Sequence, residues 1–405
     1  MYKNVNLKNV MSKKKLSTNL IRGGINRSNF METSEALFLS SGFVYQSAEE
    51  AESAFKEEKK RFMYSRFGNP TIEIFQKKMA LLEGAEECWA TSSGMSSLFT
   101  IFMSYLKKGD RVVSSKALFG SCHYIVSEIL PRFGIEVIFV DGKNLNEWES
   151  ALKIKTDMVF FETPSNPCLE LIDIEEVCKL ANKSGALTIV DNVFATPILQ
   201  KPLKFGADIV MYSATKHIDG QGRVLGGAIL GSKKFCTKFI KPFIRNTGPS
   251  ISPFNAWILL KGIETLELRV KKQTENAKKI VDFLNNNNRI SKVIYPKDHQ
   301  FEQLELANKQ MIDGGSIISF KLKTNAKNKK KETFDFLNNL KLIDISNNLG
   351  DSKTLITHPS TTTHHRFSKK EKINLDISEN LVRLSVGLEN FDDIIDDINH
   401  ALNGS

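Results

Sequence analysis

Short apolar segments that alternate with helical ones constrain the fold of this chain more than any other feature of its sequence. The apolar segments are continuous, and they occupy residues 111–115, 135–141, 157–164, 186–192, 207–213 and 226–231. Runs of this kind are typical of strands buried on both faces of a parallel sheet. Helical segments such as 174–185 lie between them. The pattern therefore predicts an α/β layer architecture with a mostly parallel sheet.

The regions on either side follow different patterns. Residues up to about 69 are loop-like with one helical stretch and predict an extended arm. Helical spacing starts at Pro70 and ends at Gly84. A stretch compatible with one long helix covers 253–284, and an α+β region is indicated by expected strands at 316–322, 340–346 and 381–387 and a final helix at 391–402. We expect an arm over 1–69, a large domain over 70–262 and a small domain over 263–405.

Composition excludes several classes of protein. Hydrophobic residues make up 41% of the 405 residues and charged residues 25%, as in ordinary globular proteins. The longest apolar run, 98–106, is far shorter than the ~18 residues that span a bilayer. Five cysteines without a CxxC pair argue against a disulfide framework or a structural zinc site. Without a signal or transit pattern we expect a cytoplasmic protein, and Met11 is an alternative start that would make residues 1–10 an extension.

The net charge of +10 raises the question of a nucleic-acid partner. The lysines are scattered, however, and their densest run, 323–332, contains no aromatic residue on which a base could stack. Such a run is usually a solvated surface loop. We therefore expect neither nucleic acid nor a membrane as a partner.

Two residues that can carry chemistry stand at the ends of expected strands. Asp191 lies at the end of the strand 186–192, and Lys216 follows the strand 207–213. Ligands of open α/β sheets bind at these carboxyl ends. A lone Asp or Lys in such a place is commonly a surface residue, but a charge that ends a buried strand is costly without a partner. Neighbouring strands could thus present a carboxylate and an amine to one ligand.

The same region offers groups for a phosphate. Ser213 and Thr215 flank the lysine with hydroxyls, and the segment 91–97, TSSGMSS, precedes an apolar helical run. The amides around Gly94 and Met95 could bind an anion at the start of that helix. An amine that forms an imine, a carboxylate for a pyridine nitrogen and a phosphate site are what pyridoxal phosphate (PLP) requires. The sequence therefore predicts PLP as a cofactor.

Other motifs carry less weight. The segment 220–226, GQGRVLG, is similar to a dinucleotide-binding loop, but Leu225 replaces the third glycine. Cys122 and His123 are adjacent, so they do not face each other as a nucleophile and its base would. We expect His217 to form structural hydrogen bonds. Three further histidines lack metal-type spacing and are expected in loops near the active site or at an interface: His358, His364 and His365.

Six blocks in order resemble the PLP enzymes of cysteine and methionine metabolism, which include cystathionine γ-synthase, cystathionine γ-lyase, methionine γ-lyase and the homoserine sulfhydrylases. The blocks are YSRFGNPT (64–71), SSGM (93–96), ETPSNP (162–167), VDNVFATP (190–197), YSATKH (212–217) and RLSVGLE (383–389). The resemblance extends from about Arg22 to Leu402. It implies PLP fold type I, like aspartate aminotransferase, with a mostly parallel seven-stranded sheet in the large domain and a smaller α+β C-terminal domain.

The resemblance also implies roles for single residues. Three residues would be catalytic. Lys216 would hold the cofactor and move protons, Asp191 would pair with the ring nitrogen of the cofactor, and Phe119 would stack on its ring. The phosphate would be bound by Gly94, Met95, Ser213 and Thr215, and by Tyr64 and Arg66 of a neighbouring subunit. A dimer would then be the smallest active unit and a dimer of dimers the usual assembly. The substrate would be bound by Arg383, whose fork suits a carboxylate, with Asn348 and Asn166.

Details within the blocks narrow the activity. Many relatives have Tyr at the position of Phe119, and methionine γ-lyases have Cys where this chain has Ser121. Phe keeps the stacking but has no hydroxyl to carry a proton, and Ser121 argues against a methionine-degrading lyase. Where many relatives have Ser-Leu-Gly, Asn348 takes the place of the Ser. Four blocks are most similar to the O-succinylhomoserine sulfhydrylases: 22–45, 117–125, 216–231 and 346–365.

The expected function is therefore a PLP-dependent γ-replacement in methionine biosynthesis, which converts O-succinyl-L-homoserine and sulfide to L-homocysteine and succinate. Three alternatives stay open. The first is a cystathionine γ-synthase that uses cysteine, or an O-acetylhomoserine sulfhydrylase. The second is a γ-lyase that eliminates without replacement. The third is a catalytically silent PLP-fold protein that only assembles with partners.

Overall fold

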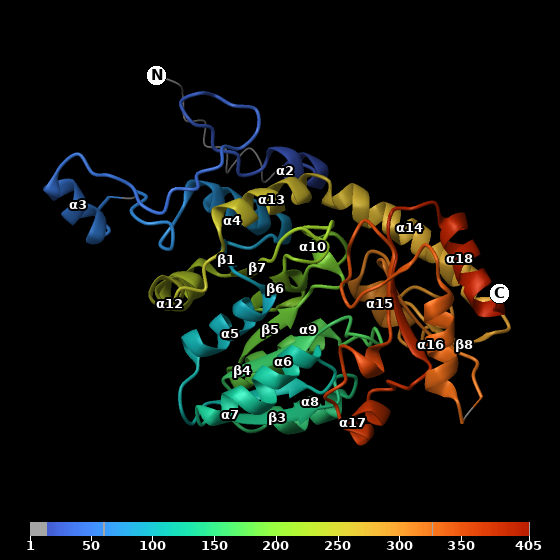
Figure 1. Ribbon diagram of the computed structural model, residues 1–405. Coiled ribbons are helices and arrows are strands. Elements are labelled where there is room, and N and C mark those ends of the chain that lie inside the picture. Colours follow the sequence, from blue (N-terminus) through green and yellow to red (C-terminus); the bar gives the residue numbers. More distant parts are fainter. Residues whose placement is uncertain (1–13, 60, 326, 405) are drawn as a thin grey trace.

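The computed structural model describes residues 14–59, 61–325 and 327–404. A seven-stranded sheet lies at its centre, and Figure 1 shows the helices around it. The strand order is β1-β7-β6-β5-β4-β2-β3. The strands are β1 Glu87–Thr91, β2 Arg111–Ser115, β3 Glu136–Val140, β4 Met158–Glu162, β5 Leu187–Asp191, β6 Ile209–Ser213 and β7 Gly227–Gly231. Strands β2 to β6 pair in parallel, whereas β7 is antiparallel to both of its neighbours. The predicted α/β fold with a mostly parallel sheet is confirmed.

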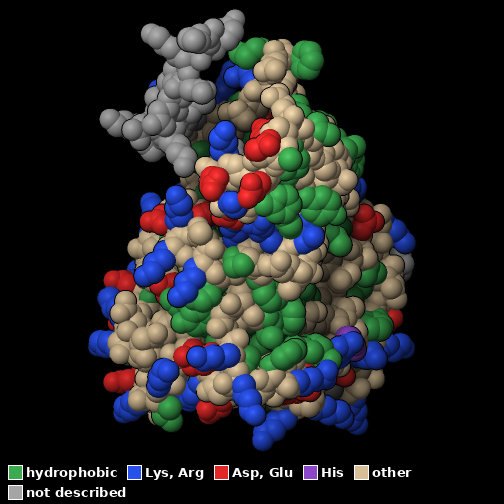
Figure 2. All heavy atoms as spheres, turned by 90° about the vertical axis from the view of Figure 1, so that its left-hand side faces the viewer, with side chains coloured by type: hydrophobic (Ala, Val, Ile, Leu, Met, Phe, Trp, Pro, Cys, Tyr) green, Lys and Arg blue, Asp and Glu red, His purple; other side chains and the backbone are tan. Residues whose placement is uncertain are grey.

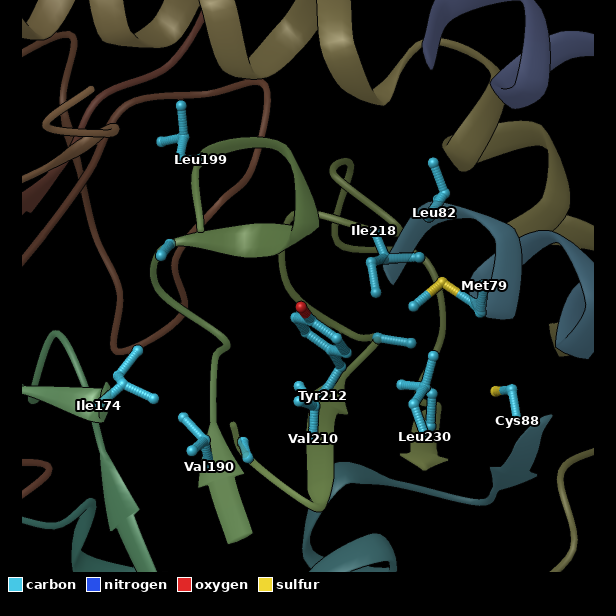
Figure 3. Packing of buried hydrophobic residues seen from close by; sticks show 14 of the residues in the cluster. Met79, Leu82, Cys88, Ile174, Val190, Leu199, Val210, Tyr212, Ile218 and Leu230 are labelled. Atoms are coloured by element: carbon cyan, nitrogen blue, oxygen red, sulfur yellow. The ribbon is translucent and has the colours of Figure 1, made fainter. Parts of the chain in front are cut away.

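Both faces of this sheet are covered, which explains why its strands are apolar throughout. Successive residues of β5 show the division: Val190 belongs to one buried cluster and Ile189 to the other. The first cluster includes residues of α4 (Pro70–Glu83), α9 (Ile174–Ser184) and α13 (Pro253–Glu264). Figure 3 shows Val210 and Leu230 in this cluster, on the side of the sheet where Met79 of α4 lies.

The second cluster lies on the opposite face. It includes residues of α5 (Gly94–Tyr105) and of a helical segment made of α6 (Gly120–Tyr124), η1 (Ile125–Ile129) and α7 (Leu130–Arg132). Shorter or peripheral elements complete the chain: α8 Leu145–Leu152, α10 Thr196–Leu199, η2 Pro202–Phe205, α11 Lys233–Phe235, η3 Cys236–Ile240, α12 Lys241–Thr247, α15 Leu304–Gln310, η4 Pro359–Thr361 and α17 Lys369–Asn374. None of the helices in the described part of the chain has the length and apolar character needed to cross a bilayer.

The C-terminal region forms a second, smaller sheet with the order β10-β11-β12-β9-β8. Its strands are β8 Ile290–Ile294, β9 Ile317–Leu322, β10 Asp344–Ile345, β11 Leu355–Thr357 and β12 Leu381–Ser385. One buried cluster joins this sheet to α14 (Leu266–Asn285), α16 (Lys329–Asn339) and α18 (Phe391–Asn403). The predicted smaller α+β domain at this end of the chain is confirmed.

Two expectations for this region need correction. The stretch 253–284 is not one helix, because the backbone leaves helical geometry at Thr265, between α13 and α14. The strand expected at 340–346 shrinks to β10. The carboxylate of Asp397 accepts hydrogen bonds from the backbone N–H groups of Lys341, Leu342 and Ile343, so these groups are not free for a sheet ladder.

The N-terminal arm projects from the body of the molecule (Figure 1). It carries α2 (Leu16–Arg22) and α3 (Ala48–Phe55), so the expectation of one helix is wrong. The sequence pattern missed α2 because it is short, and Leu20 is its one buried residue. Large apolar side chains of the arm are exposed, with Phe30 at 92% and Val44 at 88%, and Figure 2 views this side of the molecule. The alternative start at Met11 lies outside the described residues.

One buried carboxylate fastens the arm to the large sheet region. The side chain of Glu35 accepts hydrogen bonds from Lys78 Nζ at 3.3 Å and from Lys261 Nζ at 2.5 Å. The indole N–H of Trp257 donates to the backbone oxygen of Glu35 at 2.9 Å. Because Lys78 lies in α4 and Lys261 in α13, the arm is held against two helices of the body.

Candidate active site

The carboxyl ends of three parallel strands meet at one edge of the large sheet. Glu162 ends β4 and pairs in register with Asp191 at the end of β5. Ser213 ends β6, the next strand, and Lys216 lies in the turn that follows it. The structure therefore places the predicted carboxylate and the predicted lysine at the ends of neighbouring strands, because parallel strands present all their carboxyl ends at the same edge.

Lys216 is half-buried, and its amine has a defined partner. Its Nζ donates a hydrogen bond to Asn348 Oδ1 at 2.6 Å. Burial, and to a lesser degree the positive charge of Arg383, lowers the pKa of Lys216 to about 8. An amine with such a pKa is partly unprotonated near neutral pH, so it can act as a nucleophile or a base.

Two carboxyl groups lie side by side at the strand ends. Asp191 Oδ1 accepts the backbone N–H of Val193 at 3.1 Å, and burial raises the pKa of Asp191 to about 7. Burial, and then the negative charge of Asp191, raises the pKa of Glu162 well above its usual range. A cationic ring nitrogen facing Asp191 would favour its ionised form, as the opposite charge does in any buried pair.

A helix terminus reaches the same edge from the first residues of α5. The Ser93 side chain caps the helix by accepting the N–H of Ser96 at 3.1 Å. A Cβ on Gly94 would lie 2.6 Å from Ser213 Cβ and 3.1 Å from Ser213 Oγ, so the backbone approaches this serine more closely than a side chain would permit. The N–H groups of Gly94 and Met95 lie in the first turn, where helices bind anions. Glycine here builds a cradle between helix and strand.

The remaining residues expected at the phosphate differ in position. Thr215 lies in the turn after β6, and its hydroxyl accepts the N–H of Gly226 at 3.1 Å. Tyr64 and Arg66 lie in the arm instead. The guanidinium of Arg66 is 5.3 Å from the ring centre of Tyr64 and 5.0 Å from that of Phe67. Within one chain, these two residues contact each other rather than the group around Lys216.

Arg383, on β12 of the smaller sheet, is buried at this edge. One of its terminal nitrogens donates to Asn166 Oδ1 at 2.9 Å, and the other to the backbone oxygens of Asn347 and Asn348 at 3.0 and 3.1 Å. Its Nε is a buried donor without a partner among the described residues. Burial lowers the pKa of Arg383 to about 10 against the opposing influence of Glu162. A guanidinium held by neutral oxygens can bind a carboxylate ligand.

Phe119 stands beside these groups as the N-cap residue that precedes α6. It is half-buried, and its backbone N–H donates to Glu162 Oε2 at 2.8 Å. The neighbouring Cys122 is buried with its sulfur 3.9 Å from that of Met95, while the ring of His123 stacks on Phe139. These two neighbours in sequence therefore point into different surroundings.

Sequence reasoning missed Glu162 as a member of the site, although it ends an apolar strand in the same way as Asp191. It placed His364 in a loop near the active site or at an interface, without a defined role. His364 is buried, and burial followed by the charge of Arg383 lowers its pKa to about 4, so it is neutral at physiological pH. Its loop covers the start of α6, since a Cβ on Gly120 would lie 2.6 Å from the Thr363 oxygen. His217 hydrogen bonds through Nε2 with Ser316 Oγ at 2.8 Å, the structural kind of bond expected for it.

The donor set at this edge fits PLP. It combines a half-buried lysine of lowered pKa, a buried carboxyl group, a glycine that lets helix and strand approach closely, and an arginine Nε without a partner among the described residues. With a mostly parallel central sheet and a separate smaller C-terminal sheet domain, the chain is a PLP-dependent enzyme of fold type I. The sequence model of the family described as Cys/Met metabolism PLP-dependent enzyme matches residues 17–403. The chain belongs to this family, as its motifs predicted.

Three similar proteins show how near the different activities of the family lie. The O-succinylhomoserine sulfhydrylase of Mycobacterium tuberculosis is 49% identical over 382 residues, which cover 94% of this chain and 94% of that protein. The L-methionine γ-lyase of Fusobacterium nucleatum subsp. polymorphum is 41% identical over 389 residues, covering 96% and 98%. The crystal structure of cystathionine γ-synthase from Xanthomonas oryzae pv. oryzae, in complex with aminoacrylate and cysteine, superimposes with a TM-score of 0.91 at 30% identity, covering 96% and 98%.

Proposed function

We propose that this chain is an O-succinylhomoserine sulfhydrylase, which converts O-succinyl-L-homoserine and sulfide to L-homocysteine and succinate in methionine biosynthesis. The observation that carries the proposal is that Lys216 and Arg383, the residue expected to bind the substrate carboxylate, both hydrogen bond to Asn348. The side chain of Asn348 accepts a hydrogen bond from Lys216, and its backbone oxygen accepts one from Arg383. An amino acid bound by its carboxylate at Arg383 would thus have a base beside its α-carbon. The similarity to sulfhydrylases supports this choice of substrates.

Each residue then has a task. When bound, PLP supplies an aldehyde that condenses with the substrate amine and a ring that withdraws electrons from the α-carbon. Arg383 binds the substrate carboxylate with the help of Asn166 and Asn348. Asp191 balances the charge of the ring nitrogen, and Phe119 packs against the ring.

Lys216 moves the protons. Its Nζ would remove a proton from Cα and pass that proton to the cofactor, which returns the amine to its unprotonated form. It would then remove a proton from Cβ as the Cγ–O bond breaks and succinate leaves with the electron pair. Sulfide adds at Cγ, and the protons return to the two carbons. One tethered amine can serve both positions because it stays beside them throughout, and the lowered pKa of Lys216 leaves it partly unprotonated for the first step.

The phosphate would be held by the first turn of α5 and by hydroxyls near the lysine. Gly94 and Met95 offer backbone N–H groups, and Ser213 and Thr215 offer side chains. The close approach of Gly94 to Ser213 supports this arrangement, because it brings helix and strand end to one point. The positive end of the helix would add to the binding of the phosphate charge.

A homo-oligomer belongs to the same proposal. Tyr64 and Arg66 lie on the arm, so in a dimer they could reach the phosphate site of the neighbouring subunit. Four large apolar side chains of the arm are exposed, and contact with a neighbouring subunit would remove them from water: Phe30, Leu39, Val44 and Phe55. We propose a dimer as the smallest active unit and a dimer of dimers as the assembly. The break between α13 and α14 at Thr265 supports a domain boundary near residue 262.

The test is product analysis of purified protein with PLP and O-succinyl-L-homoserine, divided between sulfide and cysteine. Homocysteine formed from sulfide well ahead of cystathionine from cysteine is the expected result. Faster formation of cystathionine would identify a cystathionine γ-synthase, the second candidate, which the similarity to the Xanthomonas enzyme favours. Formation of 2-oxobutanoate without any thiol would identify a γ-lyase. Full turnover by Lys216→Ala would exclude the mechanism.

A further inference from the structure

One buried carboxylate is shared between two loops of the active site. Glu162 Oε2 accepts the backbone N–H of Phe119 at 2.8 Å, and Glu162 Oε1 accepts the backbone N–H of Asn166 at 3.0 Å. Phe119 is the N-cap residue of α6, and Asn166 lies in the loop after β4. The positions of both main-chain segments are therefore tied to the same side chain.

The connection continues into the smaller sheet. The side-chain oxygen of Asn166 accepts a hydrogen bond from Arg383 at 2.9 Å. Arg383 lies in the middle of β12, whose five residues are all buried. A continuous series of three hydrogen bonds thus runs from Phe119 through Glu162 and Asn166 to Arg383.

The base of this connection is rigid. Glu162 is the last residue of β4, all of whose residues are buried, and it is paired in register with Asp191. Each of its two oxygens already has a partner, so the carboxylate cannot turn without losing a bond. The other glutamate of the same loop, Glu170, differs from it, because it forms an ion pair with Lys143 at 3.5 Å.

We propose that Glu162 is a positioning residue that sets Phe119 and Arg383 at the correct separation from each other. The proposal rests on the proposed function in so far as Phe119 is taken to contact the cofactor and Arg383 the substrate carboxylate. A bound amino acid must lie between these two groups. A small shift of either loop would therefore weaken the binding of the α-carboxylate, although Arg383 itself would still be present.

Glu162→Gln tests the proposal. Glutamine keeps the shape of the side chain, but its NH₂ group cannot accept a hydrogen bond. One of the two backbone N–H groups, that of Phe119 or that of Asn166, would therefore lose its acceptor. The probes are L-2-aminobutyrate and propylamine, which is the same molecule without the carboxylate. Dissociation constants come from the change in cofactor absorbance of the PLP-loaded protein, and the visible circular dichroism of the cofactor is recorded without any ligand.

We expect the dissociation constant of L-2-aminobutyrate to rise about tenfold, the effect of losing one hydrogen bond. That of propylamine should change by less than about twofold, because it does not use Arg383. The circular dichroism should change, because the ring of Phe119 moves. A merely structural role would lower the melting temperature without altering the ratio of the two dissociation constants.

Glu170→Gln is the matched control, since it makes the same substitution in the same loop and should leave the ratio and the spectrum unchanged. A folded Glu162→Gln with the wild-type ratio and spectrum would overturn the proposal. If that variant does not fold, Glu162→Asp is compared in the same way, because it keeps the carboxyl group but shortens the side chain by one methylene. An unchanged ratio is again decisive. Neither probe has a leaving group at Cγ, so this result stands even if O-succinyl-L-homoserine proves not to be the substrate.

Discussion

Lys216 and Asn348 are 132 residues apart in the chain, and a hydrogen bond of 2.6 Å joins their side chains. Lys216 follows β6 of the large sheet, whereas Asn348 lies between β10 and β11 of the smaller one. The bond therefore crosses from one sheet region to the other at the active-site edge. The chemistry of the lysine depends on how the two regions meet.

The lowered pKa of Lys216 makes the loading of the cofactor dependent on pH. Only the unprotonated amine can attack the aldehyde of PLP, and burial lowers the pKa of Lys216 to about 8. We expect the rate at which cofactor-free protein binds PLP covalently to rise with pH and to level off above about 8. Stopped-flow absorbance at a series of pH values measures this rate. A midpoint near the ordinary lysine value would show that the amine is exposed to solvent in solution.

Asn348→Asp should move that midpoint upward. A carboxylate at the position that accepts the Lys216 hydrogen bond would favour the charged amine, and we expect a shift of about one pH unit. Asn347→Asp is the control, because Asn347 is exposed and contacts Arg383 only through its backbone oxygen. Equal shifts in both variants would mean that Asn348 has no special relation to the lysine.

Arg383→Lys should separate binding from turnover. Lysine keeps the charge but loses the planar fork that holds Asn166 and the backbone oxygens of Asn347 and Asn348. We expect KM for the amino-acid substrate to rise about 100-fold, the cost of roughly two hydrogen bonds to a charged group, with kcat within about tenfold of wild type. Steady-state rates over a range of substrate concentrations test this. The exposed Arg289 provides a control, and a wild-type KM in Arg383→Lys would remove Arg383 from the binding site.

Glu83 gives the stability of the fold a dependence on pH. It is buried, the hydroxyl of Tyr212 donates to its Oε2, and burial raises its pKa to about 7. Between the ordinary value of 4.5 and about 7 the unfolded chain loses this proton while the folded protein keeps it, so the contribution of Glu83 to stability falls as pH rises. The difference is about 3 kcal/mol between pH 4.5 and pH 7.

Glu83→Gln removes this ionisation and still accepts the bond from Tyr212. We therefore expect the variant to gain stability relative to wild type when the pH is raised from about 5 to about 8. Calorimetric melting temperatures of both proteins at the two pH values measure the gain. The same difference between variant and wild type at both values would mean that Glu83 does not titrate in this range.

The anchor of the arm can be tested through Glu35. Glu35→Gln removes the nearer of the two carboxylates that pair with the buried Lys78 and leaves Glu264 at 4.0 Å, and weakening a buried pair in this way costs up to about 3–5 kcal/mol. Release of N-terminal fragments should become faster in limited proteolysis, because the same residue holds the arm to α4 and α13. Glu52→Gln, in the exposed pair with Lys56, should behave as wild type. Resistance of both variants to the protease would show that other contacts hold the arm.

Local patterns predicted much of the large sheet. Six of its strands could be recognised as continuous apolar runs, because strands buried on both faces have no polar side. The helix α4 was recognised from its ends, with Pro70 in its first turn and Gly84 in the left-handed conformation at its C-cap. The pattern missed β1, whose residues Glu87 and Trp89 are only partly buried and interrupt an apolar run.

The sequence by itself determined the family, the cofactor and the order of the elements, since these depend on periodicity and on short motifs that residues close in the chain define. Tertiary structure decided which side chains meet. Arg383 hydrogen bonds to Asn166, which is 217 residues away in the sequence, and Glu162 accepts the N–H of Phe119, which is 43 residues away. Such bonds form only where packing of the two sheet regions brings the groups within about 3 Å and excludes water. The positions of Lys216 and Asp191 could be predicted from strand ends, but the hydrogen bonds that join Glu162, Asn166 and Arg383 could not.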